Sequence, residues 1–230
     1  MKQVFIGIFA HPDDESFGPS GTLAQQIENG ADVHLICATG GESGQNPDKH
    51  DDLGDIRIKE WRAAGTLLGV KSQHHLGFID GTLNNNQFHA IAEKTQAIVN
   101  GLLSDYGADT TFTFVTMDQN GISGHIDHIT MSFVASYVFV NTKAVDTRMQ
   151  ALWYYCVPLS LLPQADTSFV FRSKGRPDNE IDIINDISAV FTLKKQIMRA
   201  HQSQRSDAEM LIARAESQPK SEECFYVYKD

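Results

Sequence analysis

The chain has 230 residues, a formal net charge of −10 and 41% hydrophobic residues, which is enough apolar material for the core of one large α/β domain. The acidic balance disfavours nucleic acid or an anionic membrane as the main partner, because either would require a basic surface. No run of about 18 apolar residues could span a bilayer, and the N-terminal stretch does not have the pattern of a signal peptide. We therefore expect a soluble, cytoplasmic protein with one domain over residues 1–230 and no membrane insertion.

Apolar runs typical of strands alternate with segments of helical periodicity. Strands are expected at residues 4–9, 32–39, 73–79, 109–115 and 151–157. Helices are expected between them at 21–28, 55–68, 87–103 and 126–140. This order predicts a Rossmann-like α/β fold with a mostly parallel sheet and helices on both faces.

The C-terminal region after residue 157 is less regular. Two short runs, 169–171 and 181–183, are expected to form an antiparallel pair or edge strands. A helix at 186–199 and a final strand at 225–228 are expected to follow.

The segment Ala-His-Pro-Asp-Asp-Glu at 10–15 directly follows the first expected strand. It would place His11, Asp13 and Asp14 at the carboxyl end of that strand, where an open parallel sheet forms its binding crevice. Capping of the next helix would account for a single aspartate, but two adjacent carboxylates repel each other unless a cation or a proton separates their roles. A divalent ion resolves this, because one aspartate can bind it while the other acts as a base. The segment therefore indicates a metal-assisted hydrolase.

A second cluster, Gly-His-Ile-Asp-His at 124–128, stands at the start of an expected helix. His125 and His128 are three positions apart and can face the same side of the first helical turn. Asp127 could orient a histidine through a hydrogen bond. Surface histidines at a helix start are the plain alternative. Combined with the first cluster, the set of two histidines and one aspartate suits zinc or ferrous iron, with open positions for water and substrate.

Other polar groups each have a structural alternative. The glycine-rich loop at 40–44 lacks the Lys-Ser/Thr of a phosphate-binding loop, which favours a crevice rim over a nucleotide site. Arg57 and Glu60 could form a charge pair on one helix or contact a substrate. Asp80 could make a turn or contact a substrate, and His201 could lie near the carbonyls at a helix end or in the site.

Together these motifs resemble the PIG-L/LmbE-like family of metal-dependent N-deacetylases, which includes the N-acetylglucosaminyl deacetylases of mycothiol, bacillithiol and GPI-anchor precursor synthesis. The segments that carry the resemblance are 10–15, 39–44, 57–60, 76–81, 125–128 and the late His-Gln-Ser-Gln at 201–204. The resemblance implies a Rossmann-like fold, Zn²⁺ as cofactor (with Fe²⁺ or another divalent ion as alternatives), a small-molecule amino-sugar substrate and a homo-oligomer. One departure is Ile126, where the family usually has proline.

Position by position, the resemblance implies His11, Asp14 and His128 as metal ligands. Asp13 would be the general base that takes a proton from the attacking water. The expected reaction removes an N-acetyl group from an N-acetylglucosamine-type sugar or its conjugate.

The resemblance also implies roles around the reacting amide. His125 would stabilise the oxyanion or protonate the leaving amine, with Asp127 tuning it. Arg57 and Asp80 match positions that bind sugar hydroxyls in family members. Two alternatives stay open: an amidase for another amide such as a thiol S-conjugate, and a catalytically silent carbohydrate- or metal-binding module. The silent module is disfavoured because a binder has no need of the base Asp13.

Overall fold

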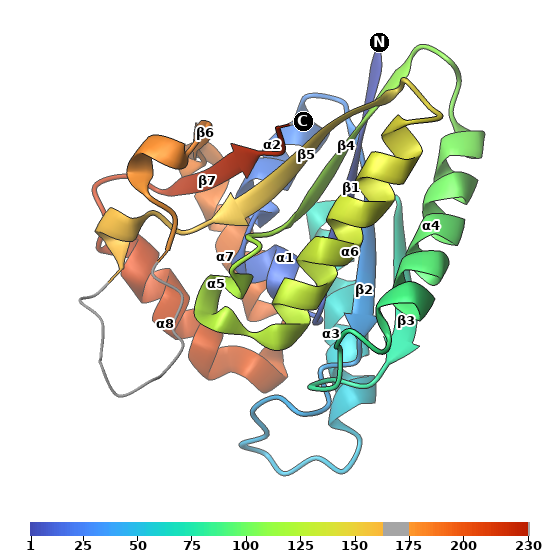
Figure 1. Ribbon diagram of the computed structural model, residues 1–230. Coiled ribbons are helices and arrows are strands. Elements are labelled where there is room, and N and C mark those ends of the chain that lie inside the picture. Colours follow the sequence, from blue (N-terminus) through green and yellow to red (C-terminus); the bar gives the residue numbers. More distant parts are fainter. Residues whose placement is uncertain (163–174, 230) are drawn as a thin grey trace.

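The computed structural model describes residues 1–162 and 175–229 (Figure 1). Within them one sheet has the strand order β3-β2-β1-β4-β5-β7-β6. Its strands are β1 (Lys2–Phe9), β2 (Asp32–Thr39), β3 (Ser72–Phe78), β4 (Thr110–Met117), β5 (Met149–Cys156), β6 (Ile183–Asp186) and β7 (Glu222–Val227). The first five strands pair in parallel, whereas β7 pairs antiparallel with β5 and β6. The expected mostly parallel α/β fold is confirmed.

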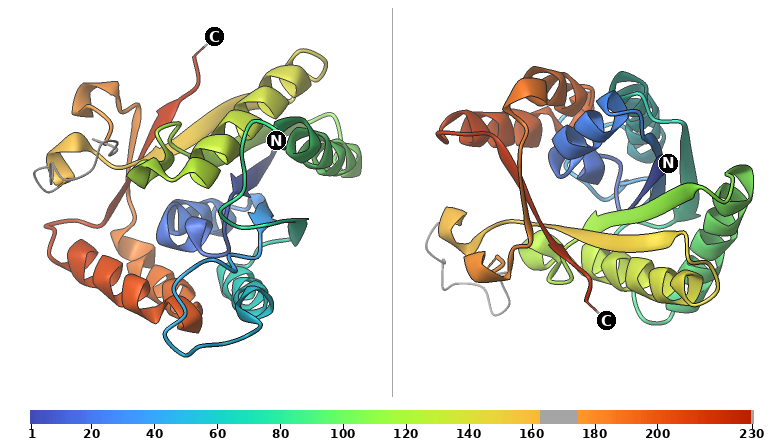
Figure 2. Two further views of the ribbon diagram at one scale, coloured as in Figure 1. Left: turned by 60° about the horizontal axis from the view of Figure 1, so that its bottom comes forward. Right: turned by 90° about the horizontal axis from the view of Figure 1, so that it is seen from above.

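Helices cover both faces of this sheet (Figure 2). They are α1 (Asp14–Phe17), α2 (Ser20–Glu28), α3 (Leu53–Leu68), α4 (Phe88–Asp105), α5 (Gly121–Gly124), α6 (Ile126–Lys143), α7 (Phe191–Arg199) and α8 (Arg205–Glu216). Short 3-10 helices occur at Leu159–Leu161, Asp178–Glu180, Ser188–Val190 and Gln202–Gln204. The pair α4 and α6 packs on one face, while α2, α3 and α7 pack on the other.

The central strand β1 is buried on both faces, which explains its continuous apolar sequence. Ile6 and Ile8 belong to the core cluster under α4 and α6, while Phe5 and Phe9 belong to the cluster under α2, α3 and α7. The chain runs outward from β1 through β2 to β3 and then returns to β4 on the other side of β1. The carboxyl ends of β1, β2 and β4 therefore meet where the strand order reverses, which is the usual ligand crevice of such sheets.

The C-terminal region differs in part from the sequence-based expectation. An edge strand is present as β6, two residues later than expected, and the 169–171 run lies outside the described residues. The helix expected from residue 186 begins at Phe191, because Asp186 ends β6 and its carboxylate accepts a hydrogen bond from the Ser188 backbone N–H. Helix α8 was not expected, since it buries only Ala208 and Ile212 and its sequence has a weak apolar stripe. Strand β7 begins three residues before the expected strand.

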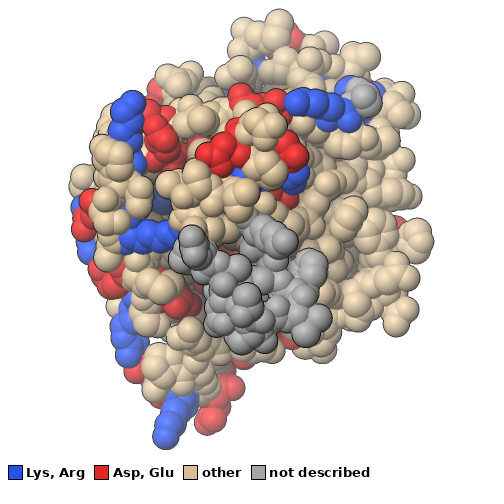
Figure 3. All heavy atoms as spheres, turned by 60° about the vertical axis from the view of Figure 1, so that its left-hand side comes forward, with Lys and Arg blue, Asp and Glu red and all other residues tan. Residues whose placement is uncertain are grey.

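Acidic and basic side chains are interspersed on the face shown in Figure 3. None of the helices in the described residues combines the length and the apolar character that crossing a lipid bilayer would require.

Candidate active site

The carboxylate of Asp14 is fixed by the backbone at the end of β1. Its Oδ2 accepts hydrogen bonds from the N–H groups of Ala10 (3.0 Å) and His11 (2.9 Å). These contacts turn the other oxygen, Oδ1, toward the start of α6, where it lies 3.1 Å from Nε2 of His128. The two separate sequence clusters are thus brought together at one point of the crevice.

His11 and His128 each point one ring nitrogen at the other: Nδ1 of His11 lies 3.0 Å from Nε2 of His128. On the far side, Nε2 of His11 lies 2.9 Å from Asp80 Oδ1 and 3.5 Å from Asp127 Oδ2. The far nitrogen of His128, Nδ1, lies 3.0 Å from the carbonyl oxygen of Gly121. Each far nitrogen therefore faces acceptors and is the natural place for the ring proton. The two facing nitrogens then either share a proton in the 3.0 Å hydrogen bond between them or, with both rings neutral, offer their lone pairs to a metal ion.

This set of donor atoms fits a divalent metal ion. The facing nitrogens of His11 and His128 are 3.0 Å apart, and the Asp14 carboxylate reaches them at 3.1 and 3.7 Å. Ligands bound to tetrahedral zinc at about 2.0–2.1 Å lie about 3.3 Å from one another. His125 adds another ring nitrogen, since ligand atoms of His11, His125 and His128 all lie within 4.8 Å of each other. Two imidazole nitrogens and a carboxylate that converge in this way are stabilised by a proton or by a metal ion between them.

The electrostatics of the buried groups also favour a positive charge here. Burial lowers the pKa of His11, but its hydrogen bonds to the carboxylates of Asp127, Asp14 and Asp80 outweigh this and raise it to about 12. Burial raises the pKa of Asp14, but the nearby His128 and His11 hold it well below its usual range. A proton on the imidazoles satisfies the carboxylates, and a divalent ion would satisfy them in its place.

Asp13 is held in a strained backbone conformation, with φ at 155° and ψ at −19°. Such conformations persist where surrounding contacts fix them, and they are frequent at functional sites. Here Oδ2 of Asp13 accepts a 2.8 Å hydrogen bond from Nη2 of Arg57. Burial raises the pKa of Asp13 to about 6, and the Arg57 charge limits the rise. A carboxylate of this kind suits proton transfer near neutral pH.

The glycine-rich loop makes room for Arg57. Nη1 of Arg57 donates a 2.7 Å hydrogen bond to the Gly41 carbonyl, and a Cβ atom at Gly41 or Gly44 would collide with the guanidinium group. Only glycine fits at a position where another group approaches the backbone this closely. The sequence indicated a crevice rim at this loop. It did not indicate why glycine is needed, because Arg57 lies 13 or more positions further along the chain.

Arg57 and Asp80, both expected to contact the substrate, are buried at 4% and 6% exposure. Oδ2 of Asp80 accepts a 2.9 Å hydrogen bond from the Ser43 backbone N–H, while Oδ1 faces His11. Arg57 is engaged by Asp13 and the glycine-rich loop. Through these contacts, Arg57 supports Asp13 and Asp80 supports His11. A contact of either residue with sugar hydroxyls stays a prediction.

Asp127 and His125 meet through the backbone. The Asp127 carboxylate accepts hydrogen bonds from the N–H groups of Gly81 (2.7 Å) and Leu83 (3.1 Å). Its contact with His125 is made by the backbone: the Asp127 N–H donates to Nδ1 of His125 at 3.2 Å. His125 is exposed, and burial of part of its ring together with the charge of His128 lowers its pKa. His125 is therefore a neutral ring whose Nδ1 accepts the Asp127 N–H and whose Nε2 carries the proton.

The C-terminal segment ties α1 to α3 from behind the site. His201 is fully buried, with Nε2 2.9 Å from Ser16 Oγ, which donates to Glu15 at 2.8 Å. Ser203 donates from its backbone N–H (2.8 Å) and its hydroxyl (2.6 Å) to Glu60. Glu60 therefore does not pair with an arginine of its own helix. His201 lies behind α1, and a sequence separation of 185 positions hides this contact from local pattern analysis.

A mostly parallel α/β sheet with a histidine–aspartate cluster at the central strand ends defines a Rossmann-like protein with a candidate metal centre in its crevice. The sequence model of the PIG-L family, described as GlcNAc-PI de-N-acetylase, matches residues 6–139. This is more than half of the chain, and the chain belongs to this family. The family expected from the sequence motifs is confirmed.

Named relatives agree with this placement, and a solved structure shares the fold. A 1D-myo-inositol 2-acetamido-2-deoxy-alpha-D-glucopyranoside deacetylase of Mycolicibacterium smegmatis is 28% identical, over 86% of this chain and 78% of the relative. A probable N-acetyl-alpha-D-glucosaminyl L-malate deacetylase 2 of Bacillus cereus is 29% identical, over 89% and 84%. The structure of N,N'-diacetylchitobiose deacetylase from Pyrococcus horikoshii has a TM-score of 0.68 at 19% identity and covers 99% of this chain and 83% of that one.

Proposed function

We propose that this protein is a metal-dependent N-deacetylase that removes the acetyl group from an N-acetylglucosamine-type sugar or its conjugate. The observation that carries the proposal is the meeting of His11, Asp14 and His128 beside the strained Asp13. The relatives named as deacetylases of N-acetylglucosaminyl conjugates supply the substrate class. The alternative of a silent binding module gives no role to a strained carboxylate held beside the ligands.

His11, Asp14 and His128 would hold the ion, and Zn²⁺ is the first choice because it favours imidazole and carboxylate ligands at these spacings. When bound, such an ion lowers the pKa of a coordinated water toward about 7 and polarises the amide carbonyl. Fe²⁺ is the second choice for the same ligand set. Asp80 and Asp127 would keep the His11 ring in the orientation that directs Nδ1 into the centre.

Three residues of the chain would act in the proton transfers and in stabilising the oxyanion. Asp13 takes a proton from the attacking water, and Arg57 holds its carboxylate in position for this step. His125, as a neutral ring, donates a hydrogen bond from its Nε2–H to the developing oxyanion. Asp13 then passes the proton that it took from water to the leaving nitrogen, a step that His125 could perform only in its protonated form. The C–N bond breaks as the amine is protonated, and the products are acetate and a free amino sugar.

The proposal is tested by acetate release from N-acetylglucosaminyl-inositol, N-acetylglucosaminyl-malate and chitooligosaccharides, with and without a chelator. We expect release from at least one of these substrates, loss of release with chelator and recovery on addition of Zn²⁺ or Fe²⁺. Turnover only on another amide, such as a thiol S-conjugate, would favour the amidase alternative. A protein that binds metal but turns over none of these amides would favour the binding module. A cytoplasmic location and a homo-oligomer stay predictions.

A further inference from the structure

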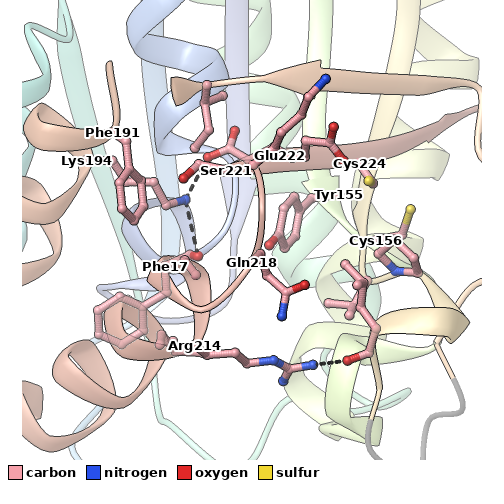
Figure 4. A pocket seen from close by; sticks show the side chains of 18 of the residues that line it. Phe17, Tyr155, Cys156, Phe191, Lys194, Arg214, Gln218, Ser221, Glu222 and Cys224 are labelled. Carbon is pink, nitrogen blue, oxygen red and sulfur yellow. Dashed lines mark hydrogen bonds and ion pairs between the residues drawn. The ribbon is translucent and has the colours of Figure 1, made fainter. Parts of the chain in front are cut away.

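An apolar pocket of about 350 Å³ lies among α7, α8, the end of β5 and the start of β7 (Figure 4). None of the proposed metal ligands lines it. Its apolar wall includes Phe17, Val157, Ile187, Phe191, Met198 and Leu211. Pockets of this size, with apolar walls and a few polar groups, are the usual form of small-molecule sites in proteins.

Three polar side chains stand in one part of this pocket: Tyr155, Gln218 and Arg214 (Figure 4). Gln218 lies between the other two in this view. Arg214 uses one guanidinium nitrogen, Nη2, to hydrogen bond to the carbonyl oxygen of Leu161, and its other N–H groups remain available. Within the described residues, the Tyr155 hydroxyl and the Gln218 side chain make no hydrogen bond. The pocket thus combines an apolar wall with hydrogen-bond donors that have free capacity.

The remaining charged residues of the pocket offset one another. Lys194 donates to Glu223 at 2.6 Å, and Glu223 also accepts from two backbone N–H groups at the start of α2. Lys220 and Glu222 are both exposed and stand two positions apart, so their charges balance. The lining of the pocket therefore has a net positive charge, which Arg214 carries. An anionic ligand is therefore complementary to it.

We propose that this pocket binds a monocarboxylate with an apolar chain or ring. The apolar part would lie against Phe191, Met198 and Leu211, and the carboxylate would accept hydrogen bonds from Arg214 and Gln218. Arginine presents paired N–H donors that match the two oxygens of a carboxylate. This inference does not depend on the proposed deacetylase activity.

Calorimetric titration of the full chain with octanoate, 1-octanol and octylamine tests the proposal. We expect octanoate to bind more tightly than 1-octanol, and octylamine to bind least. A series from hexanoate to decanoate should tighten about fourfold per methylene until the pocket is full. Equal binding of the three head groups, or absence of octanoate binding, would overturn the proposal.

Two matched pairs of variants locate the site. Ala215→Trp fills the pocket from α8, whereas Ala213→Trp places the same ring on an exposed part of that helix outside the pocket. Arg214→Ala removes the cationic group, and Arg199→Ala removes an exposed arginine elsewhere that pairs with Glu209.

We expect Ala215→Trp to abolish octanoate binding and Ala213→Trp to leave it unchanged. Arg214→Ala should weaken octanoate about tenfold without weakening 1-octanol, and Arg199→Ala should change neither. If Arg214→Ala weakens the acid and the alcohol equally, or if Ala215→Trp folds and still binds octanoate, the assignment to this pocket is wrong. Thermal unfolding of each variant identifies any that fail to fold. If Ala215→Trp does not fold, the comparison of Arg214→Ala with Arg199→Ala tests the assignment.

Discussion

Arg57 donates a 2.8 Å hydrogen bond to Oδ2 of Asp13, 44 positions away in the sequence. The other oxygen, Oδ1, makes no hydrogen bond with the described residues. The contact therefore fixes the carboxylate through one oxygen and leaves the second free for a proton. A carboxylate aligned in this way beside the candidate metal centre suits the proposed role of base in amide hydrolysis.

Asp13→Asn keeps the shape of the side chain and removes its ability to take a proton. We expect kcat to fall by about 10² or more, with little change in bound metal, since Asp13 is not among the proposed ligands. Acetate release and metal content are measured on the same preparation. Activity near that of the unmodified protein would remove Asp13 from the role of base.

His128 and His125 stand three positions apart, and their substitution should separate metal binding from turnover. His128→Ala removes a ring that directs Nε2 at Asp14 and His11, so we expect loss of bound metal. His125→Ala should retain metal and lose turnover if its exposed ring contacts the substrate, as proposed. The metal content of dialysed protein gives the answer. If His125→Ala loses metal as His128→Ala does, His125 is a ligand.

Gly44→Ala should displace Arg57, because the added Cβ would collide with the guanidinium group. We expect reduced kcat with a folded protein, as the contact to Asp13 is disturbed. Gly101→Ala is the matched control, since nothing lies near its added Cβ in the middle of α4. That variant should keep full activity and gain about 0.5–1 kcal/mol in the free energy of unfolding. Full activity of Gly44→Ala would show that Arg57 has room to move without consequence.

Much of the fold and the main site clusters could be predicted because their signals are local. The apolar run of β1 followed at once by His11, Asp13 and Asp14 reads as a strand and a crevice, and parallel order brings the start of α6 to the same edge. The local patterns gave no such information on α8, where only two residues are buried.

The supporting contacts of the site could not be predicted from the sequence. Arg57 and Glu60 have the spacing of a helical charge pair, yet each is bound by a distant segment, Asp13 in one case and Ser203 in the other. Tertiary packing decides such choices, because a surface i,i+3 pair contributes only about 0.2–0.5 kcal/mol. Tertiary packing likewise sets the contacts of Asp80 with His11 and Ser43, and its contact with a substrate stays a prediction.

The buried His201 gives a prediction for stability as a function of pH. Burial lowers its pKa to about 3 in the folded protein, whereas an unfolded histidine titrates near 6.5. The unfolded chain therefore binds this proton more readily. Stability from this residue is fully present above about pH 6.5 and is lost as the pH falls from there toward 3, by about 1.4 kcal/mol per unit.

His201→Gln isolates that effect, because the amide is neutral throughout and can still donate to Ser16. Between about pH 7.5 and 5.5, the free energy of unfolding of the unmodified protein should fall by about 1.4 kcal/mol more than that of the variant. Urea unfolding with chelator present in both samples measures the difference and removes the contribution of metal loss. Parallel pH dependences for the two proteins would mean that His201 is protonated equally in the folded and unfolded states, in conflict with its burial behind α1.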